Sequence, residues 1–298
     1  MKKIIFFLLI SSLFFPRQSH AVTFAVMGDT QSFQSGSGSF ASAVANIKKK
    51  KPQVVVVVGD LISDCADDNA CRNYWSSWKS IAAPILEKTY PAMGNHDRVN
   101  ASVEAADALW QEVFSLPTNG PSGFSELAYS FNKGNSHFVI LNSSKPNNYK
   151  VDSAQRSWLE QDLAAARKKK HKFVFFHMPA YPVSGHIGSS LDVYPEERDA
   201  LWEILDRYEV SAVFNGHEHL FSRRKIDSTL YPGAQNSTYQ FTIGGTDTAY
   251  IYSAPEVGMT EYYSLEQNFA IVNAKKKSVK VDLYATNGTL LHSFRYRK

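Results

Sequence analysis

Residues 54–60 have the sequence Val-Val-Val-Val-Val-Gly-Asp, and this stretch decides the fold. Five consecutive valines followed by glycine predict a buried strand that stops at Gly59 and presents Asp60 at its carboxyl end. Residues 22–29 repeat the arrangement, because an apolar run ends there at Gly-Asp. Helical spacing over residues 40–47 lies between the two runs, so the chain is predicted to open with strand, helix, strand.

Three later strands are predicted to end in polar residues of the same kind. Residues 90–93 precede Gly94-Asn95-His96-Asp97, residues 173–176 precede His177, and residues 212–214 precede Asn215-Gly216-His217-Glu218-His219. In open α/β sheets, ligands bind outside the carboxyl ends of the strands, where successive loops converge. Loops far apart in sequence are therefore expected to build one site.

The rest of the pattern predicts an α/β protein of two sheets packed face to face, with helices outside. Helical stretches are expected at residues 70–82, 101–113, 153–169 and 196–207. After residue 238 the helical signal stops, and strands are expected at residues 239–243, 269–272, 279–284 and 290–294. We expect these late strands to form a second, largely antiparallel sheet.

The beginning of the chain has the features of a signal peptide over residues 1–21. Lys2 and Lys3 precede an apolar run over residues 4–15, and Ser19-His20-Ala21 is a small-x-small cleavage signal. The run is too short to span a bilayer comfortably, so an uncleaved anchor is the weaker alternative. We expect one domain over residues 22–298, periplasmic or secreted, with no membrane attachment after cleavage.

Net charge disfavours a nucleic-acid partner. Residues 1–21 contain three basic residues and no acid, so their removal lowers the formal charge from +4 to +1. Domains that neutralise a nucleic-acid backbone are usually strongly basic. The basic runs at residues 48–51 and 168–170 each close a predicted helix, where cations offset the helix dipole, and we interpret them as solvated faces.

The chain has two cysteines, Cys65 and Cys71. In an oxidising compartment such a pair is expected to form a disulfide. The alternative, a soft metal site, would need a further cysteine or a well-placed histidine close in sequence, and there is none.

Taken together, the polar residues after the strands favour a metal centre, although each alone is a weak signal. Six side chains offer oxygen or imidazole ligands: Asp29, Asp60, Asn95, His177, His217 and His219. Six ligands exceed the needs of one tetrahedral ion, and imidazole with carboxylate suits Zn, Mn or Fe. A carboxylate such as Asp60 can bridge two ions that clamp the attacking and leaving oxygens of an in-line displacement.

These blocks resemble, in order, the five motifs of the calcineurin-like metallophosphoesterase superfamily, which includes purple acid phosphatases and cyclic-nucleotide phosphodiesterases. The resemblance implies a four-layer αββα sandwich of two mixed β-sheets flanked by helices. It also implies two divalent or trivalent metal ions (Fe, Mn or Zn) and a small phosphorylated substrate. We expect a phosphomonoesterase; a phosphodiesterase and a phosphate-binding protein that has lost catalysis are the alternatives.

The resemblance also implies roles for single residues. Asp29, Asp60 and His219 would bind one ion, and Asp60, Asn95, His177 and His217 the other. His96 would contact the phosphate and protonate the leaving group, with Asp97 orienting it, while a hydroxide bridging the ions attacks phosphorus. Asn95 and His186 are further candidates for substrate contact, although His186 could equally be a solvent-exposed loop histidine.

The chain departs from the family's pattern at two positions. Gln31 stands where the common first motif has histidine, and we expect it either to ligate the first ion through its amide oxygen or to bond a metal-bound water. Ser63 stands where purple acid phosphatases have a tyrosine ligand, so the purple Fe(III)–phenolate colour is not expected.

Overall fold

The computed structural model of this chain describes residues 21–98, 103–248, 253–255 and 258–298. The predicted signal peptide lies outside these residues, apart from Ala21. None of the described helices combines the length and the apolar character that crossing a membrane requires.

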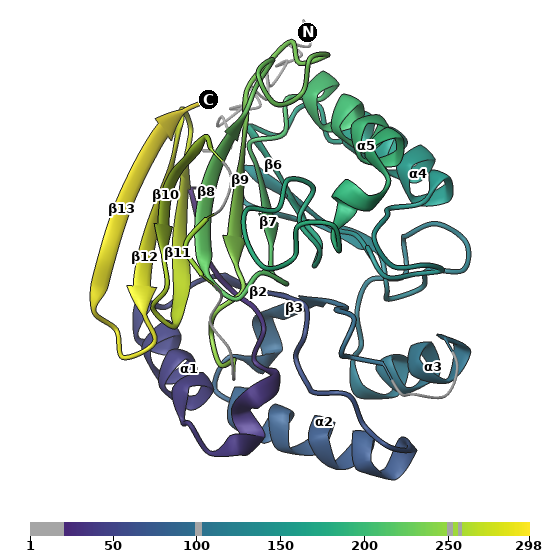
Figure 1. Ribbon diagram of the computed structural model, residues 1–298, viewed down its shortest axis with the longest axis vertical. Coiled ribbons are helices and arrows are strands. Elements are labelled where there is room, and N and C mark those ends of the chain that lie inside the picture. Colours follow the sequence, from purple (N-terminus) through teal and green to yellow (C-terminus); the bar gives the residue numbers. More distant parts are fainter. Residues whose placement is uncertain (1–20, 99–102, 249–252, 256–257) are drawn as a thin grey trace, which may run out of the picture.

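Two mixed β-sheets form the centre of the described fold (Figure 1). The first has the order β13-β12-β11-β1-β2-β3 and consists of β1 (Val22–Met27), β2 (Val54–Val58), β3 (Thr89–Ala92), β11 (Asn268–Lys275), β12 (Ser278–Ala285) and β13 (Leu290–Arg297). The second has the order β10-β8-β9-β7-β6-β5-β4 and consists of β4 (Tyr129–Lys133), β5 (Ser136–Ile140), β6 (His171–Phe175), β7 (Ala212–Asn215), β8 (Phe221–Ile226), β9 (Thr238–Ile243) and β10 (Thr260–Ser264).

Helices cover the outer face of each sheet, which makes four layers. The helices are α1 (Ser39–Lys50), α2 (Asp68–Ala82), α3 (Val103–Val113), α4 (Ser153–Ala165) and α5 (Pro195–Arg207). Helices α1 to α3 pack on the first sheet, and α4 and α5 pack on the second (Figure 1). The predicted αββα architecture is confirmed.

The valines of β2 show how one sequence serves two layers. Val54, Val56 and Val58 point into the apolar core between the sheets, while Val55 and Val57 point toward the helices. Successive strand residues face opposite sides, and both sides of this strand are covered. An unbroken apolar run is therefore required here.

Phe24 of β1 lies at the centre of the core between the sheets. Its ring centroid is 4.9 to 5.1 Å from those of Phe173 and Phe138 in the second sheet. Aromatic pairs at such distances add to the stabilisation that comes from burial. These contacts join the two sheets, and with them the loops that follow β1 and β6.

The expectation for the late strands was wrong. They do not form a separate sheet, because β9 joins β7 in parallel and β11 pairs antiparallel with β1, extending the first sheet through β12 and β13. The residue pattern of a strand reports which faces are buried, but it does not report the partner strand.

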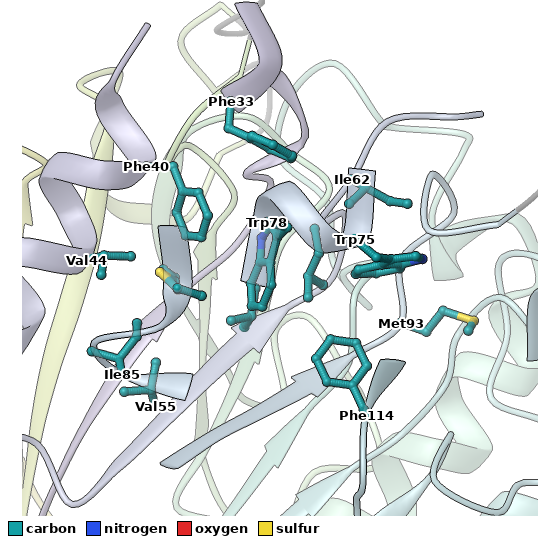
Figure 2. Packing of buried hydrophobic residues seen from close by; sticks show 14 of the residues in the cluster. Phe33, Phe40, Val44, Val55, Ile62, Trp75, Trp78, Ile85, Met93 and Phe114 are labelled. Carbon is teal, nitrogen blue, oxygen red and sulfur yellow. The ribbon is translucent and has the colours of Figure 1, made fainter. Parts of the chain in front are cut away.

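The predicted disulfide between Cys65 and Cys71 is present, and both cysteines are buried. It links the loop after β2 to the first turn of α2. Trp78 anchors the same helix to α1 and to the loop after β1. Its ring stacks on Phe40 of α1 (Figure 2), and its indole N–H donates to Thr30 Oγ1 at 2.9 Å. The core under α2 thus supports the loops that carry Asp29 and Asp60.

Replacing Trp78, which is 0% exposed, should destabilise the fold severely. Trp78→Ala is expected to lower the free energy of unfolding by about 3–5 kcal/mol, because it leaves a large cavity. Urea unfolding followed by far-ultraviolet circular dichroism measures the change. Trp158→Ala, at a half-buried position on α4, is the matched control and should cost clearly less. Equal losses in the two variants would contradict the anchoring role.

Candidate metal centre

The polar residues that follow β1, β2, β3, β6 and β7 meet at one edge of the sandwich. Across the gap between the sheets, the Asp60 Oδ2 atom lies 3.2 Å from His177 Nε2. The backbone N–H of His217 donates to both Asp29 carboxylate oxygens at 2.9 and 3.1 Å. Ligand atoms of Asp60, His177 and His217 all lie within 4.8 Å of one another, a spacing that suits a metal ion.

The atoms around the His177 ring indicate that a cation fits this site. Its ring is fully buried, and Nδ1–H donates to the carbonyl oxygen of Val58 at 2.8 Å. In the neutral ring Nε2 then carries a lone pair, yet it faces two oxygens: Asp60 Oδ2 at 3.2 Å and Asn95 Oδ1 at 3.1 Å. A cation among these three atoms, either a metal ion or the proton of a charged ring, removes the repulsion, so the donor set fits a metal ion. The backbone carbonyl that fixes the ring is a common partner of metal-binding histidines.

His217 is held in the same manner by the loop after β6. Its Nε2–H donates to the carbonyl oxygen of Ser189 at 2.9 Å, which leaves Nδ1 to act as the ligand atom. The ring of His186 stacks on it, with centroids 3.7 Å apart. His186 therefore lies beside the centre, in contact with a candidate ligand, and is not a freely solvated loop residue.

A second group of ligand atoms lies around Asp29. His219 Nε2 is 3.5 Å from Asp29 Oδ1 and 3.4 Å from the amide nitrogen of Gln31. Among the described residues, Gln31 Oε1 is buried without a hydrogen-bond partner. A half-turn of the amide exchanges its oxygen and nitrogen, so the oxygen can face a cation shared with His219. This donor set also fits an ion.

The two departures from the family's pattern are in contact with each other. The Ser63 hydroxyl donates to the backbone carbonyl of Gln31 at 2.8 Å. A tyrosine at position 63 has no Oγ, so it could not make this hydrogen bond in the same way. The two changes therefore belong to one local arrangement.

The backbone at the site is strained. Asp29, Asp60 and His217 have φ values of 55°, 52° and 70°, in the left-handed region that residues with a side chain seldom adopt. Such conformations cost on the order of 1–3 kcal/mol each and persist where the surrounding structure enforces them. The position of Gly59 is restricted in a second way. Its φ is 95°, and any side chain there would overlap the His177 ring.

The pKa values of the buried acids of the site are shifted in different directions. Burial, and then the charge of Asp60, raises the pKa of Asp29 well above its usual value and that of Asp97 to about 7. Burial acts in the same direction on Asp60, but the adjacent His177 and His96 outweigh it and hold its pKa below the usual value. Crowded carboxylates of this kind are stabilised by a bound cation.

Two histidines of the site, His186 and His217, are kept neutral, which is the form that binds metals. Burial, and then the positive charge of neighbouring histidines, lowers the pKa of His186 to about 4 and that of His217 well below its usual value. Metal ligation requires an unprotonated imidazole nitrogen.

His96 has a different partner from the one expected. Its Nδ1 is 3.0 Å from Asp64 Oδ1, whereas Asp97 accepts hydrogen bonds from the backbone N–H groups of Leu61, Ile62 and Gly94. The expectation that Asp97 orients the ring is therefore corrected. Asp97 holds the loop after β2 to the loop after β3, and Asp64 contacts the imidazole of His96. Asp64 directly precedes the disulfide cysteine Cys65. Its place in the sequence alone does not indicate contact with His96.

Glu218 is a further residue that sequence analysis passed over. It is 0% exposed and accepts hydrogen bonds from the backbone N–H groups of Val183 and Ser184. Burial raises its pKa to about 7 although these donors act against that rise. Its carboxylate thus fastens the segment that carries His186 beside the centre. The only sequence feature that pointed to Glu218 was its position between the candidate ligands His217 and His219.

The structure brings the sequence-predicted ligands together in two neighbouring groups. The first comprises Asp29, Gln31 and His219. The second comprises Asp60, Asn95, His177 and His217. His96 lies at the edge of the second group, with 39% of its side chain exposed.

The family model described as calcineurin-like phosphoesterase matches residues 22–221 of this chain. Purple acid phosphatase 21 of Arabidopsis thaliana is 30% identical over 223 residues, which cover 70% of this chain and 46% of that protein. A 3',5'-cyclic-nucleotide phosphodiesterase of Nostoc sp. is 24% identical over 230 residues, covering 76% of this chain and 79% of that protein.

A solved structure gives the same fold. The purple acid phosphatase PPD1 from yellow lupin (Lupinus luteus) seeds aligns with a TM-score of 0.77 and 17% identity, covering 93% of this chain and 54% of that one. The chain spans 30 to 48% of the length of the Arabidopsis purple acid phosphatases that it matches.

Asp60→Asn should lose metal, because a neutral amide oxygen cannot replace a carboxylate that lies 3.2 Å from His177 Nε2 and whose charge also reaches Asp29. We expect about two ions per purified chain in the parent protein, as a centre for in-line displacement requires, and at most one in the variant. Inductively coupled plasma mass spectrometry after gel filtration measures the content. Asp64→Asn, four residues further on and outside the ligand groups, should retain its ions. Full metal content in Asp60→Asn would refute the shared position of this carboxylate.

Proposed function

Because this chain belongs to the calcineurin-like phosphoesterase family, we propose that it hydrolyses phosphate monoesters at a dinuclear metal centre. The observation that carries the proposal is the arrangement at His177. A buried imidazole nitrogen with its lone pair faces a carboxylate and an amide oxygen, and a cation is the simplest group that satisfies all three.

Seven residues would hold the ions. Asp29, Gln31 and His219 supply the first position, and Asn95, His177 and His217 supply the second, with Asp60 shared between them. Bound ions supply Lewis-acid polarisation of the phosphoryl group and activation of the attacking water. Carboxylate, amide and imidazole ligands suit Fe, Mn or Zn, and the absence of a tyrosine at position 63 argues against the Fe(III)–phenolate form.

His96 is proposed as the general acid. Its Nδ1 faces Asp64 at 3.0 Å, and its Nε2 lies 4.0 Å from Asp60 Oδ2, on the side of the ligand groups. Burial acts to lower the pKa of His96, but Asp60 and Asp64 together raise it above the ordinary value. A ring that carries a proton on Nε2 would deliver it to the departing oxygen, and the raised pKa favours that form. This contribution is lost as pH rises through the raised pKa.

Asn95 and His186 are proposed to contact the phosphate. Asn95 Oδ1 is 3.1 Å from His177 Nε2, and His186 lies against His217, so both border the ligand groups. Glu218 is a positioning residue in this scheme, because it holds the segment of His186 without contacting the centre.

A phosphodiesterase is the second candidate, and the Nostoc relative, of which this chain matches 79%, favours it.

We also propose that residues 1–21 direct export to the periplasm or the medium. The disulfide of Cys65 and Cys71 suits an oxidising compartment.

Turnover of p-nitrophenyl phosphate and of bis(p-nitrophenyl) phosphate separates the two candidates. With Mn, Zn or Fe supplied, we expect kcat/KM for the monoester to exceed that for the diester by about tenfold or more, which is a difference of about 1.4 kcal/mol in transition-state stabilisation. The reverse preference would establish the phosphodiesterase. Turnover of neither ester by metal-loaded protein would refute hydrolysis.

His96→Asn should retain its metal ions and lose activity according to the leaving group. General-acid assistance is worth roughly 10²–10⁴-fold, and it matters most for a poor leaving group. The loss of kcat should therefore be larger for an alkyl phosphate than for p-nitrophenyl phosphate.

Asp64→Asn is the companion variant, because it keeps the His96 ring but removes its partner. It should show the same dependence on the leaving group with a smaller loss. A loss in His96→Asn that is equal for both esters, with metals retained, would show that His96 binds phosphate and does not supply the proton.

A further inference from the structure

A second concentration of charge lies at the opposite ends of the strands from the candidate metal centre. It lines a cavity of about 530 Å³ formed by the loop from α4 to β6, the start of β6, the turn between β11 and β12, and the end of the chain. Seven basic side chains line this basic pocket: Arg167, Lys169, Lys170, Lys172, Lys276, Lys277 and Lys298.

The basic pocket is far more positive than the rest of the protein. Its lining includes one acid, Glu209, so its side chains carry a formal charge of +6. Residues 22–298 contain 29 basic and 28 acidic residues, a formal charge of +1, so the remainder of this segment is negative. A concentration of like charge against the overall balance costs energy unless an opposite charge is supplied.

The protein itself supplies little of that opposite charge. In the part of the chain that the structure describes, no carboxylate oxygen lies within the 4.0 Å ion-pair distance of any of the seven basic groups. Elsewhere cations such as Arg223 and Lys280 do have carboxylate partners, at 2.9 and 2.8 Å. Lys169 Nζ donates to the backbone carbonyl of Gly134, which is neutral.

The shape of the basic pocket indicates what kind of anion fits. Lys172 is recessed, with 8% of its surface exposed, whereas Lys170, Lys276 and Lys277 are exposed around it. Burial lowers the pKa of the Lys172 ammonium and Glu209 only partly offsets this, so an anion beside it would relieve the cost. A flat surface such as a membrane would touch the exposed lysines but would not reach Lys172. A compact anion that enters the hollow can contact all of them.

We propose that the basic pocket binds a compact, soluble polyanion that carries several phosphate or sulfate groups. Ammonium and guanidinium groups are the usual partners of such groups in proteins. The site is separate from the metal centre, because Lys172 and His177 stand near opposite ends of β6. The five residue steps from Lys172 to His177 correspond to on the order of 16 Å along an extended strand. The anion held there would therefore not be the one being hydrolysed.

Isothermal titration with myo-inositol hexasulfate tests the proposal on the intact protein, because this probe carries several charges and offers no phosphate ester to the metal centre. We expect saturable binding of about one molecule per chain, weakened by salt as ion pairing requires. Inorganic tripolyphosphate should displace the probe, whereas single sulfate ions at the same ionic strength should not.

The decisive variant is Lys170→Ala/Lys276→Ala/Lys277→Ala. Its affinity should be roughly ten- to hundredfold lower, since three charge contacts are removed. The matched control is Lys48→Ala/Lys49→Ala/Lys50→Ala, which removes the same charge from exposed positions at the end of α1 and should bind as the parent does. Lys277→Glu, a single change in an exposed turn, is the second variant should the triple variant fold poorly, and it too should weaken binding about tenfold.

Three outcomes would overturn the proposal: no saturable binding by the parent, equal binding by the pocket and control variants, or lysine-dependent binding to phosphatidylglycerol vesicles without binding of the hexasulfate. All three lysine variants should turn over p-nitrophenyl phosphate as the parent does. A failure of hydrolysis therefore tests the proposed function, and a failure of binding tests the basic pocket.

Discussion

The hydrogen bond from His177 to the carbonyl oxygen of Val58 is the interaction on which the site depends. It crosses from the second sheet to the first, and it fixes which imidazole nitrogen faces Asp60 and Asn95. Its geometry depends in turn on the spacing of the two sheets, which the core around Phe24 sets. A site built from both sheets can be only as precise as the packing between them.

The geometry of the site requires strained backbone conformations around the candidate ligands. Asp29, Asp60 and His217 adopt left-handed conformations, and Gly59 lies where a side chain would displace the His177 ring. A few kcal/mol of local strain of this kind is tolerated because the apolar clusters on both sides of each sheet hold the loops in place. Stability and site geometry are thus coupled through the ends of β1, β2 and β7.

The two ends of the sandwich have opposite electrostatic character. The end that carries the ligand groups gathers buried carboxylates whose pKa values are displaced in both directions, which suits bound cations. The other end gathers ammonium and guanidinium groups in a hollow, which suits bound anions. A formal charge of +1 for residues 22–298 conceals this separation, so the overall charge is a poor guide to the partners of either end.

The sequence by itself determined the strands that end at Asp29, Asp60 and His177, and the ligand types that follow them, because a buried strand needs an apolar run and a metal needs hard or borderline donors. It also determined the disulfide of Cys65 and Cys71, since the chain has two cysteines. Only the tertiary structure decided that the late strands divide between the sheets, that Asp64 and not Asp97 contacts His96, and that the lysines of four segments line one hollow. The physical reason is that periodicity reports whether a face is buried, whereas partners are chosen by contacts between segments distant in sequence.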